Sequence, residues 1–123
     1  MEAIAPDRAA ALVERHLQLF NEPDRVKREQ AMPEVYTADL LFTDPHYRSV
    51  GYQGYCDAAD AVHARFPGFT IRDHDGMDVH HDLARFGWTL NAPETPPLQG
   101  IDVIRFRDDL IAEIAIFIDS PFA

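Results

Sequence analysis

The sequence predicts an α+β domain, with helices in the first half of the chain and an antiparallel sheet in the second. Between residues 9 and 20 apolar side chains recur at helical spacing, whereas residues 69–119 alternate or run apolar in stretches of strand length. Neither an internal repeat nor a linker interrupts the 123 residues, which is the size of one domain. We therefore expect one domain over residues 1–123.

Composition excludes several classes of partner. The chain is 46% hydrophobic and carries a net charge of −10, which repels phosphate backbones and anionic membrane surfaces, so we expect no nucleic-acid or membrane partner. No apolar run is long enough to span a bilayer, and the N-terminal residues lack the features of a signal peptide. The single cysteine, Cys56, cannot form an internal disulfide. A soluble cytoplasmic protein is the expectation.

The first half of the chain predicts three helical segments. Pro6 and Asp7 open the first helix, and Asn21 and Pro23 end it. Its inward face consists of apolar residues at helical spacing: Ala9, Leu12, Val13, Leu17 and Phe20. A short helix over 24–30 is capped by Asp24, and residues 33–36 add one further turn. The third helix is expected over residues 55–66, because Pro67 and Gly68 end it.

Strands are expected at residues 40–43, 69–79, 83–91, 99–107 and 110–119. Asp44 and Pro45 end the first of them, and residues 47–54 form a loop. Turn-rich breaks at residues 80–82, 92–97 and 107–109 separate the last four strands, which predicts a β-meander.

Two acids stand out as candidate site residues. Asp44 lies at the end of an apolar strand, where it either forms a turn or acts as a base. Asp102 lies among Ile101, Val103 and Ile104, and a charge is expensive on an interior strand. Asp102 can be a neutral hydrogen-bond donor in a pocket. The alternative is an ion pair with one of the arginines on the neighbouring strands, Arg72, Arg85 or Arg105.

Several segments together resemble one family. They are Tyr36–Asp39 followed by Leu41–Pro45, Gly54 before an alanine-rich stretch, Arg85–Leu90 and Gly100–Phe106. Their order over nearly the whole chain is similar to the nuclear transport factor 2-like superfamily, and most of all to its SnoaL-like branch, which includes polyketide cyclases. The resemblance implies a cone-shaped, strongly curved antiparallel sheet closed by three helices around a deep apolar pocket, and commonly a homodimer.

Steroid isomerases of the same superfamily suggest roles for individual residues. Asp44 matches the acid that is their general base, and Asp102 matches the acid that donates a hydrogen bond to the enolate. His16 stands where those enzymes have a tyrosine that completes the oxyanion hole. The alternative for His16 is a satisfied histidine at the edge of the helix, the commoner role for an isolated histidine. The expected lining of the substrate pocket consists of aromatic residues and one histidine: Phe20, Tyr47, Tyr55, His63, Trp88 and Phe117.

The leading functional hypothesis is a cofactor-independent isomerase or cyclase that acts on a small apolar carbonyl compound, such as a polyketide or steroid. A second version has the paired acids activate water on an epoxide or dehydrate an alcohol. The third hypothesis is a non-catalytic ligand-binding or assembly domain.

A metal site is the least favoured possibility. The histidines considered for it are His46, His63, His80 and His81, with Asp78 and Asp82 near the last pair. Adjacent histidines on a strand point to opposite faces, so His80 and His81 chelate poorly together. No metal and no cofactor are therefore expected.

Overall fold

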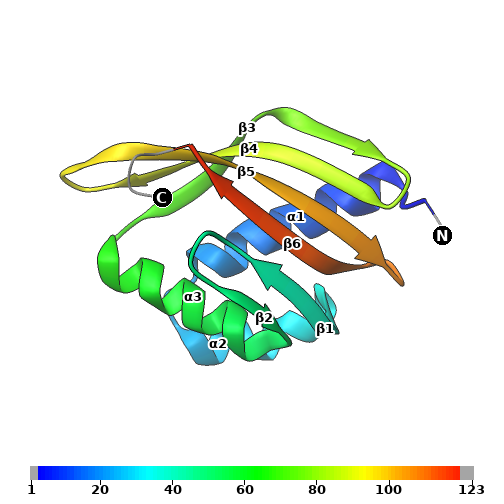
Figure 1. Cartoon of the computed structure of the whole chain (residues 1–123), viewed down its shortest axis with the longest axis horizontal. Coiled ribbons are helices and arrows are strands. Elements are labelled where there is room, and N and C mark those ends of the chain that lie inside the picture. The colour runs from blue at the N-terminus through cyan, green and yellow to red at the C-terminus, as the bar shows by residue number, and fades with distance from the viewer. Residues whose placement is uncertain (1–2, 120–123) are drawn as a thin grey trace.

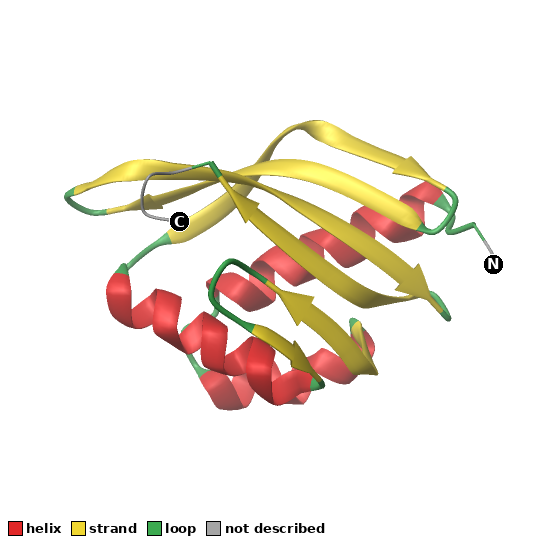
Figure 2. Cartoon of the chain, in the orientation of Figure 1, coloured by secondary structure: helices red, strands yellow, loops and turns green. Residues whose placement is uncertain are grey.

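The computed structural model describes residues 3–119 of the chain, residue 75 by its backbone only. One curved, open sheet of six strands has the helices on one of its faces (Figure 1). Figure 2 shows the two layers by secondary structure. The predicted α+β class is confirmed.

The helical layer follows the predicted pattern. Helix α1 spans Pro6–Asn21 and crosses beneath the long strands, while α2 (Arg25–Ala31) and α3 (Tyr52–Arg65) lie near the short strands (Figure 1). As predicted, Asp24 caps α2, because its Oδ1 accepts the backbone N–H of Val26 at 2.9 Å. A short 3₁₀ turn, Met32–Glu34, leads into the first strand.

The strands are β1 (Tyr36–Thr43), β2 (Arg48–Val50), β3 (Thr70–His80), β4 (Leu83–Ala92), β5 (Thr95–Arg107) and β6 (Leu110–Ile118), and their order across the sheet is β2-β1-β6-β5-β4-β3. The meander from β3 to β6 is antiparallel, as expected. One pair differs: β1 runs parallel to β6, with Phe42 opposite Ile114. The sheet is mixed because α3 and the meander return the chain beside β1 in the same direction.

The curvature of the sheet has a local origin in breaks of register. Partner positions shift between His74 and Met77 in β3, between Leu90 and Ala92 in β4, and between Arg105 and Phe106 in β5. Irregularities of this kind bend a strand and increase its twist. The concave face that results is the face on which α1 packs.

Two sequence-based boundaries were wrong. Residues 47–54 were expected to be a loop, but β2 and the first turn of α3 lie there. The break expected at 92–97 is a tight turn at Pro93 and Glu94, and β5 already begins at Thr95. Pro96 and Pro97 are tolerated in the strand because they lie within the register shift, between the Leu90–Leu98 and Ala92–Thr95 pairs.

Candidate active site

A cavity of about 90 Å³ lies between α1, the end of α3 and the concave face of the sheet. Its ionisable lining groups are His16 on α1, Asp44 after β1 and Asp102 on β5. The remaining lining is apolar or aromatic: Leu17, Phe20, Val62, Phe66, Ile71, Trp88, Leu90, Leu98, Ile116 and Ile118. The two acids singled out from the sequence therefore share one cavity.

Asp102 is fixed by hydrogen bonds to both of its oxygens. It is 3% exposed and lies on β5 opposite Phe86 of β4. Trp88 Nε1 donates to Oδ1 at 2.8 Å, and His16 Nε2 lies 3.1 Å from Oδ2. These two hydrogen bonds fix the orientation of the carboxyl group, which is also part of the cavity wall.

None of the arginines proposed as alternative partners contacts Asp102 within residues 3–119. Arg105 pairs with Asp82 at 3.0 Å, and Arg85 pairs with Asp78 at 3.0 Å. Arg72 lines a separate groove on the outside of α1. The hydrogen-bond partners of Asp102 are thus a histidine and a tryptophan, and not one of the arginines considered from the sequence.

A chain of buried hydroxyl groups continues from His16. The His16 Nδ1 atom is 2.6 Å from the Tyr36 hydroxyl, which lies 3.1 Å from the Tyr55 hydroxyl. Burial raises the pKa of Tyr36 well above its ordinary value and also raises the pKa of Tyr55, so both hydroxyls keep their protons.

These protons specify a consistent hydrogen-bond arrangement. Tyr36 donates its proton to the Tyr55 hydroxyl, so the Tyr36 oxygen accepts a hydrogen bond from His16 Nδ1. The other ring nitrogen of His16, Nε2, shares a hydrogen bond with Asp102 Oδ2. Both ring nitrogens are occupied, so in this arrangement His16 orients Asp102 and has no free donor for a ligand.

The two carboxylate oxygens of Asp44 have different surroundings. Oδ1 accepts the backbone N–H groups of His46 and Tyr47 at 2.8 and 2.7 Å, which is the turn chemistry expected of an aspartate before a proline. Among residues 3–119, none donates a hydrogen bond to Oδ2. The half-buried side chain lines the cavity. Turn formation and a free carboxylate oxygen are therefore compatible at this residue.

A second hollow of about 350 Å³ continues from the cavity, and we call it the mouth. Cavity and mouth share five lining residues: Asp44, Val62, Phe66, Leu98 and Ile118. The mouth adds His46, Tyr47, Ala58, Ala61 and Arg65. Asp44 thus stands where the inner cavity meets the outer hollow.

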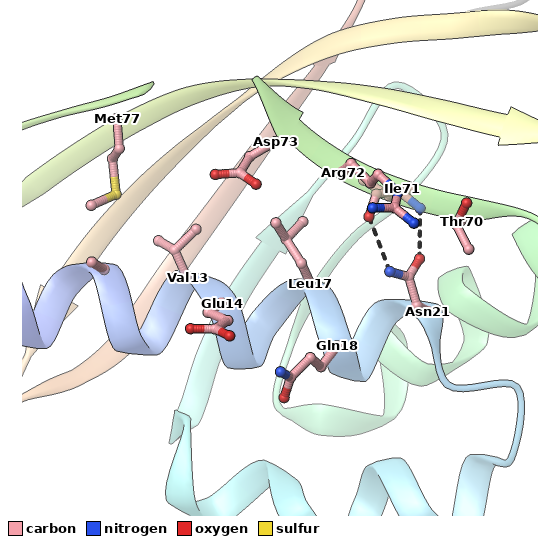
Figure 3. A pocket seen from close by; sticks show the side chains of 11 residues that line it. Val13, Glu14, Leu17, Gln18, Asn21, Thr70, Ile71, Arg72, Asp73 and Met77 are labelled. Atoms are coloured by element: carbon pink, nitrogen blue, oxygen red, sulfur yellow. Dashed lines mark hydrogen bonds between the residues drawn. The ribbon is translucent and has the colours of Figure 1, made fainter. Parts of the chain in front are cut away.

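A further hollow, of about 630 Å³, is an outer groove between α1 and β3 (Figure 3). Asn21 at the end of α1 fixes this edge by bonding the backbone N–H and C=O of Ile71 at 2.7 and 3.0 Å. Leu17 and Ile71 line both groove and cavity, so they form the wall between the two. Asp73 and Glu14 give the groove a charged lining, unlike the apolar cavity (Figure 3).

The structure brings some of the other predicted pocket residues to the cavity. Phe20 and Trp88 line it. Tyr55 lies behind it, in the hydroxyl chain that reaches His16. Tyr47 lines the mouth and is 43% exposed.

His63 and Phe117 do not line the cavity. His63 Nε2 is 2.8 Å from the Phe20 carbonyl oxygen, and its ring packs 4.3 Å from the ring of Phe69. Phe117 is 57% exposed, because successive strand residues face opposite sides and its neighbours Ile116 and Ile118 face the cavity. Alternation along β6 decides which residues reach the site.

Tyr36 is the site residue that sequence reasoning missed. We expected it in a helical turn, but it is the first residue of β1 and is fully buried. The available signal was its hydroxyl, because a buried tyrosine needs a hydrogen-bond partner. The sequence could not indicate that this partner is His16.

Two further searches cover residues 3–119. Nowhere in that range do three or more histidine, cysteine, aspartate or glutamate residues cluster as a metal site would require. None of the helices in this part of the chain is long and apolar enough to cross a membrane.

Comparison with solved structures places the fold among similar domains. A candidate isomerase of the SnoaL-like family from Agrobacterium tumefaciens superposes with a TM-score of 0.83 at 23% identity, over 93% of this chain and 99% of that one. A candidate polyketide cyclase from Sinorhizobium meliloti gives 0.71 at 16% identity, over 91% and 94% of the two chains. A candidate ketosteroid isomerase from Kribbella flavida gives 0.71 at 14%, over 95% and 82%.

No curated protein matches the sequence significantly. The sequence profile of the SnoaL-like domain matches residues 13–114, which is most of the chain and includes His16, Asp44 and Asp102. The chain belongs to the SnoaL-like domain family.

Proposed function

We propose that the protein is a cofactor-independent acid–base enzyme, an isomerase or cyclase, that acts on a small carbonyl compound. The observation that carries this proposal is that Asp44 and Asp102 line one apolar cavity, one with a free oxygen and the other held by two hydrogen bonds. Carboxylates in two different environments can take opposite roles in proton transfer. The isomerase and cyclase relatives support the same class of chemistry.

Asp44 takes the role of the base. Its Oδ2 removes a proton from the carbon next to the carbonyl group, while Oδ1 remains in the turn that aims the side chain. Most of the cavity lining around Asp44 is apolar, so a bound ligand displaces water from the inner side of the carboxylate.

Asp102 stabilises the oxygen of the enolate. Trp88 Nε1 donates to Asp102, and both ring nitrogens of His16 are already hydrogen-bonded, so neither residue has a donor left for the substrate. The proposed donor is therefore a proton on Asp102 itself, and its two bound neighbours orient the carboxyl group. His16 is a positioning residue in this scheme, because it acts through Asp102.

The reaction is completed without a further group. If the enolate is conjugated to a second double bond and Asp44 returns its proton to the far carbon of that system, the double bond has moved and the reaction is an isomerisation. If the enolate carbon instead attacks a second carbonyl group of the same molecule, a carbon–carbon bond forms, the new alkoxide takes the proton back from Asp44, and the product is a cyclic aldol.

The size of the cavity favours one competing function. A closed apolar cavity of about 150 Å³ binds benzene, whereas this cavity measures about 90 Å³. The volume therefore favours a module that binds a small ligand without turnover as the second candidate. Water activation by the two acids has weaker support, because no arginine that could polarise an epoxide or hydroxyl oxygen is among the described residues that line the cavity.

Proton exchange tests the proposal without knowledge of the natural substrate. Butanone and cyclopentanone are incubated with the protein in D₂O, and NMR measures the loss of signal from protons next to the carbonyl group. We expect exchange about a hundredfold or more above the buffer rate, the acceleration typical of one positioned base. Saturable binding of the ketones with exchange at the buffer rate would instead establish the non-catalytic module.

A further inference from the structure

The mouth gives information about the part of the ligand that the inner cavity cannot hold. Ligand sites for drug-sized molecules measure roughly 300–1,000 Å³, whereas the cavity measures about 90 Å³ and the mouth about 350 Å³. A ligand larger than a few heavy atoms that enters the cavity must therefore extend into the mouth. Its carbonyl end lies in the cavity and its remainder passes Asp44 into the mouth.

The residues that only the mouth contributes include one permanent positive charge. Arg65 lies in the last turn of α3, with its guanidinium carbon 5.3 Å from the centre of the Phe66 ring. Phe66 lines both hollows, so the guanidinium group is held beside the path between them.

The position of Arg65 distinguishes it from the other arginines of this acidic chain. The arginines Arg25, Arg28, Arg85, Arg105 and Arg107 each form an ion pair with a carboxylate. Among the described side chains, the exposed Arg65 has no such partner, and of the arginines without one it is the one that lines the mouth. An unpaired guanidinium beside an apolar passage is suited to a carboxylate supplied by a ligand.

We infer that the substrate is an oxo acid, with its carbonyl group in the inner cavity and its carboxylate at Arg65. This inference rests on the proposed function and names the substrate class. The carboxylate of Asp44 also lines the mouth and repels an anion. The ligand carboxylate must therefore lie on the Arg65 side of the mouth, which requires a chain of carbon atoms between the two ends of the ligand.

Matched pairs of probes test the inference. The acids are 4-oxopentanoate, 5-oxohexanoate and 6-oxoheptanoate, and each is compared with its neutral methyl ester. Titration followed by protein NMR gives the two dissociation constants, and proton exchange in D₂O is measured on the same samples. For at least one chain length we expect the acid to bind roughly three- to tenfold tighter than the ester, the range of a partly exposed ion pair.

The variants Arg65→Gln and Arg72→Gln separate a local effect from net charge. Both remove one positive charge, but Arg72 lines the outer groove and not the mouth. We expect R65Q to bring acid and ester within about twofold of each other, the level at which an ion pair contributes almost nothing, and R72Q to keep the wild-type preference. Equal binding of acid and ester by the wild-type protein, tighter binding of the esters, or equal effects of the two variants would each overturn the inference.

The binding measurement tests the anion site and the exchange measurement tests the enzyme activity, so either hypothesis can fail without the other. A preference for acids that depends on Arg65 supports the oxo-acid site even if proton exchange stays at the buffer rate, in which case the proposed enzyme activity fails alone. Exchange of acids and esters at equal rates and with equal affinity supports the enzyme and removes the anion site.

Discussion

Two buried polar clusters in the described part of the chain, one around Arg28 and one around Asp102, differ in what surrounds them. Arg28 lies between α2 and α3 and is fully buried, with its guanidinium group bonded to Asp60 and to the carbonyl oxygens of Glu22 and Cys56 at 2.9 and 3.2 Å. Each oxygen of Asp102 also forms a hydrogen bond with a protein group, but the side chain is part of a cavity wall.

The difference teaches that buried polarity alone does not identify a site. Arg28 and Asp60 bind two helices together, and no cavity or mouth residue belongs to that cluster. Burial would raise the pKa of Asp60, but hydrogen bonds from Arg28 and Arg25 lower it below its ordinary value. The cluster is a charge-compensated structural link. The Asp102 cluster has the additional feature of an adjoining space that a ligand can enter.

The largest effect expected from this comparison is on stability. Replacement of Arg28 by methionine leaves two backbone carbonyls without their donors and Asp60 without its closest cation. We expect the free energy of unfolding to fall by about 3 kcal/mol, measured by urea denaturation. Proton exchange per folded molecule should not change, and a large loss of exchange in a folded variant would mean that this cluster also serves the site.

The second effect is on rate. Asp102→Asn keeps the shape of the side chain but removes the acidic proton, and we expect exchange to fall about a hundredfold. The matched control is Asp82→Asn, because Asp82 is equally buried but pairs with Arg105 outside the cavity. A comparable loss of rate in both variants would mean that the Asp102 effect is structural.

A smaller loss of rate is expected at Trp88. Trp88→Phe removes the N–H group that donates to Asp102 Oδ1 but keeps an aromatic ring in the cavity wall. We expect about a tenfold slower exchange, which corresponds to roughly 1.4 kcal/mol, the scale of one hydrogen bond to a carboxyl group. Phe86→Leu provides the comparison, since Phe86 is buried on the same strand and does not line the cavity.

The smallest effect concerns pH. Burial raises the pKa of Tyr36 and of Tyr55 above the ordinary value of 10.0, so the folded chain binds their protons more tightly than the unfolded chain does. The stability that this provides is complete below about pH 10 and declines as pH rises above it. Tyr55→Phe should reduce the decline of unfolding free energy between pH 9.5 and 11, measured by urea denaturation. An unchanged slope would show that Tyr55 ionises normally in the folded protein.

The sequence was informative about the fold because its signals are local. The cap at Asp24, the proline after Asp44 and the alternation of residues 83–91 each determine structure over a few positions, and the structure follows them. The sequence did not indicate which residues far apart in the chain contact one another in the folded protein. The contact between His16 and Asp102 joins positions 86 apart, and only the folded sheet brings them to 3.1 Å.

The site itself was predictable in part. Asp102 was recognisable because an acid among apolar residues needs a partner, but arginine was as reasonable a partner as histidine. Phe117 was selected for its aromatic ring, yet the alternation along β6 turns it outward. The residue type indicates which side chains are suited to line a pocket. Which of them actually line it depends on which face of the sheet each strand position points to.

The most direct test of the account concerns Asp44, where turn former and base are combined in one side chain. Asp44→Asn preserves an oxygen that can accept the N–H groups of His46 and Tyr47 but removes the base. Asp73→Asn, in the outer groove, is the control with the same change of charge. Exchange of ketone protons in D₂O should fall to the buffer rate in D44N with folding and ligand binding retained, and should be unchanged in D73N. Wild-type exchange in D44N would contradict the account.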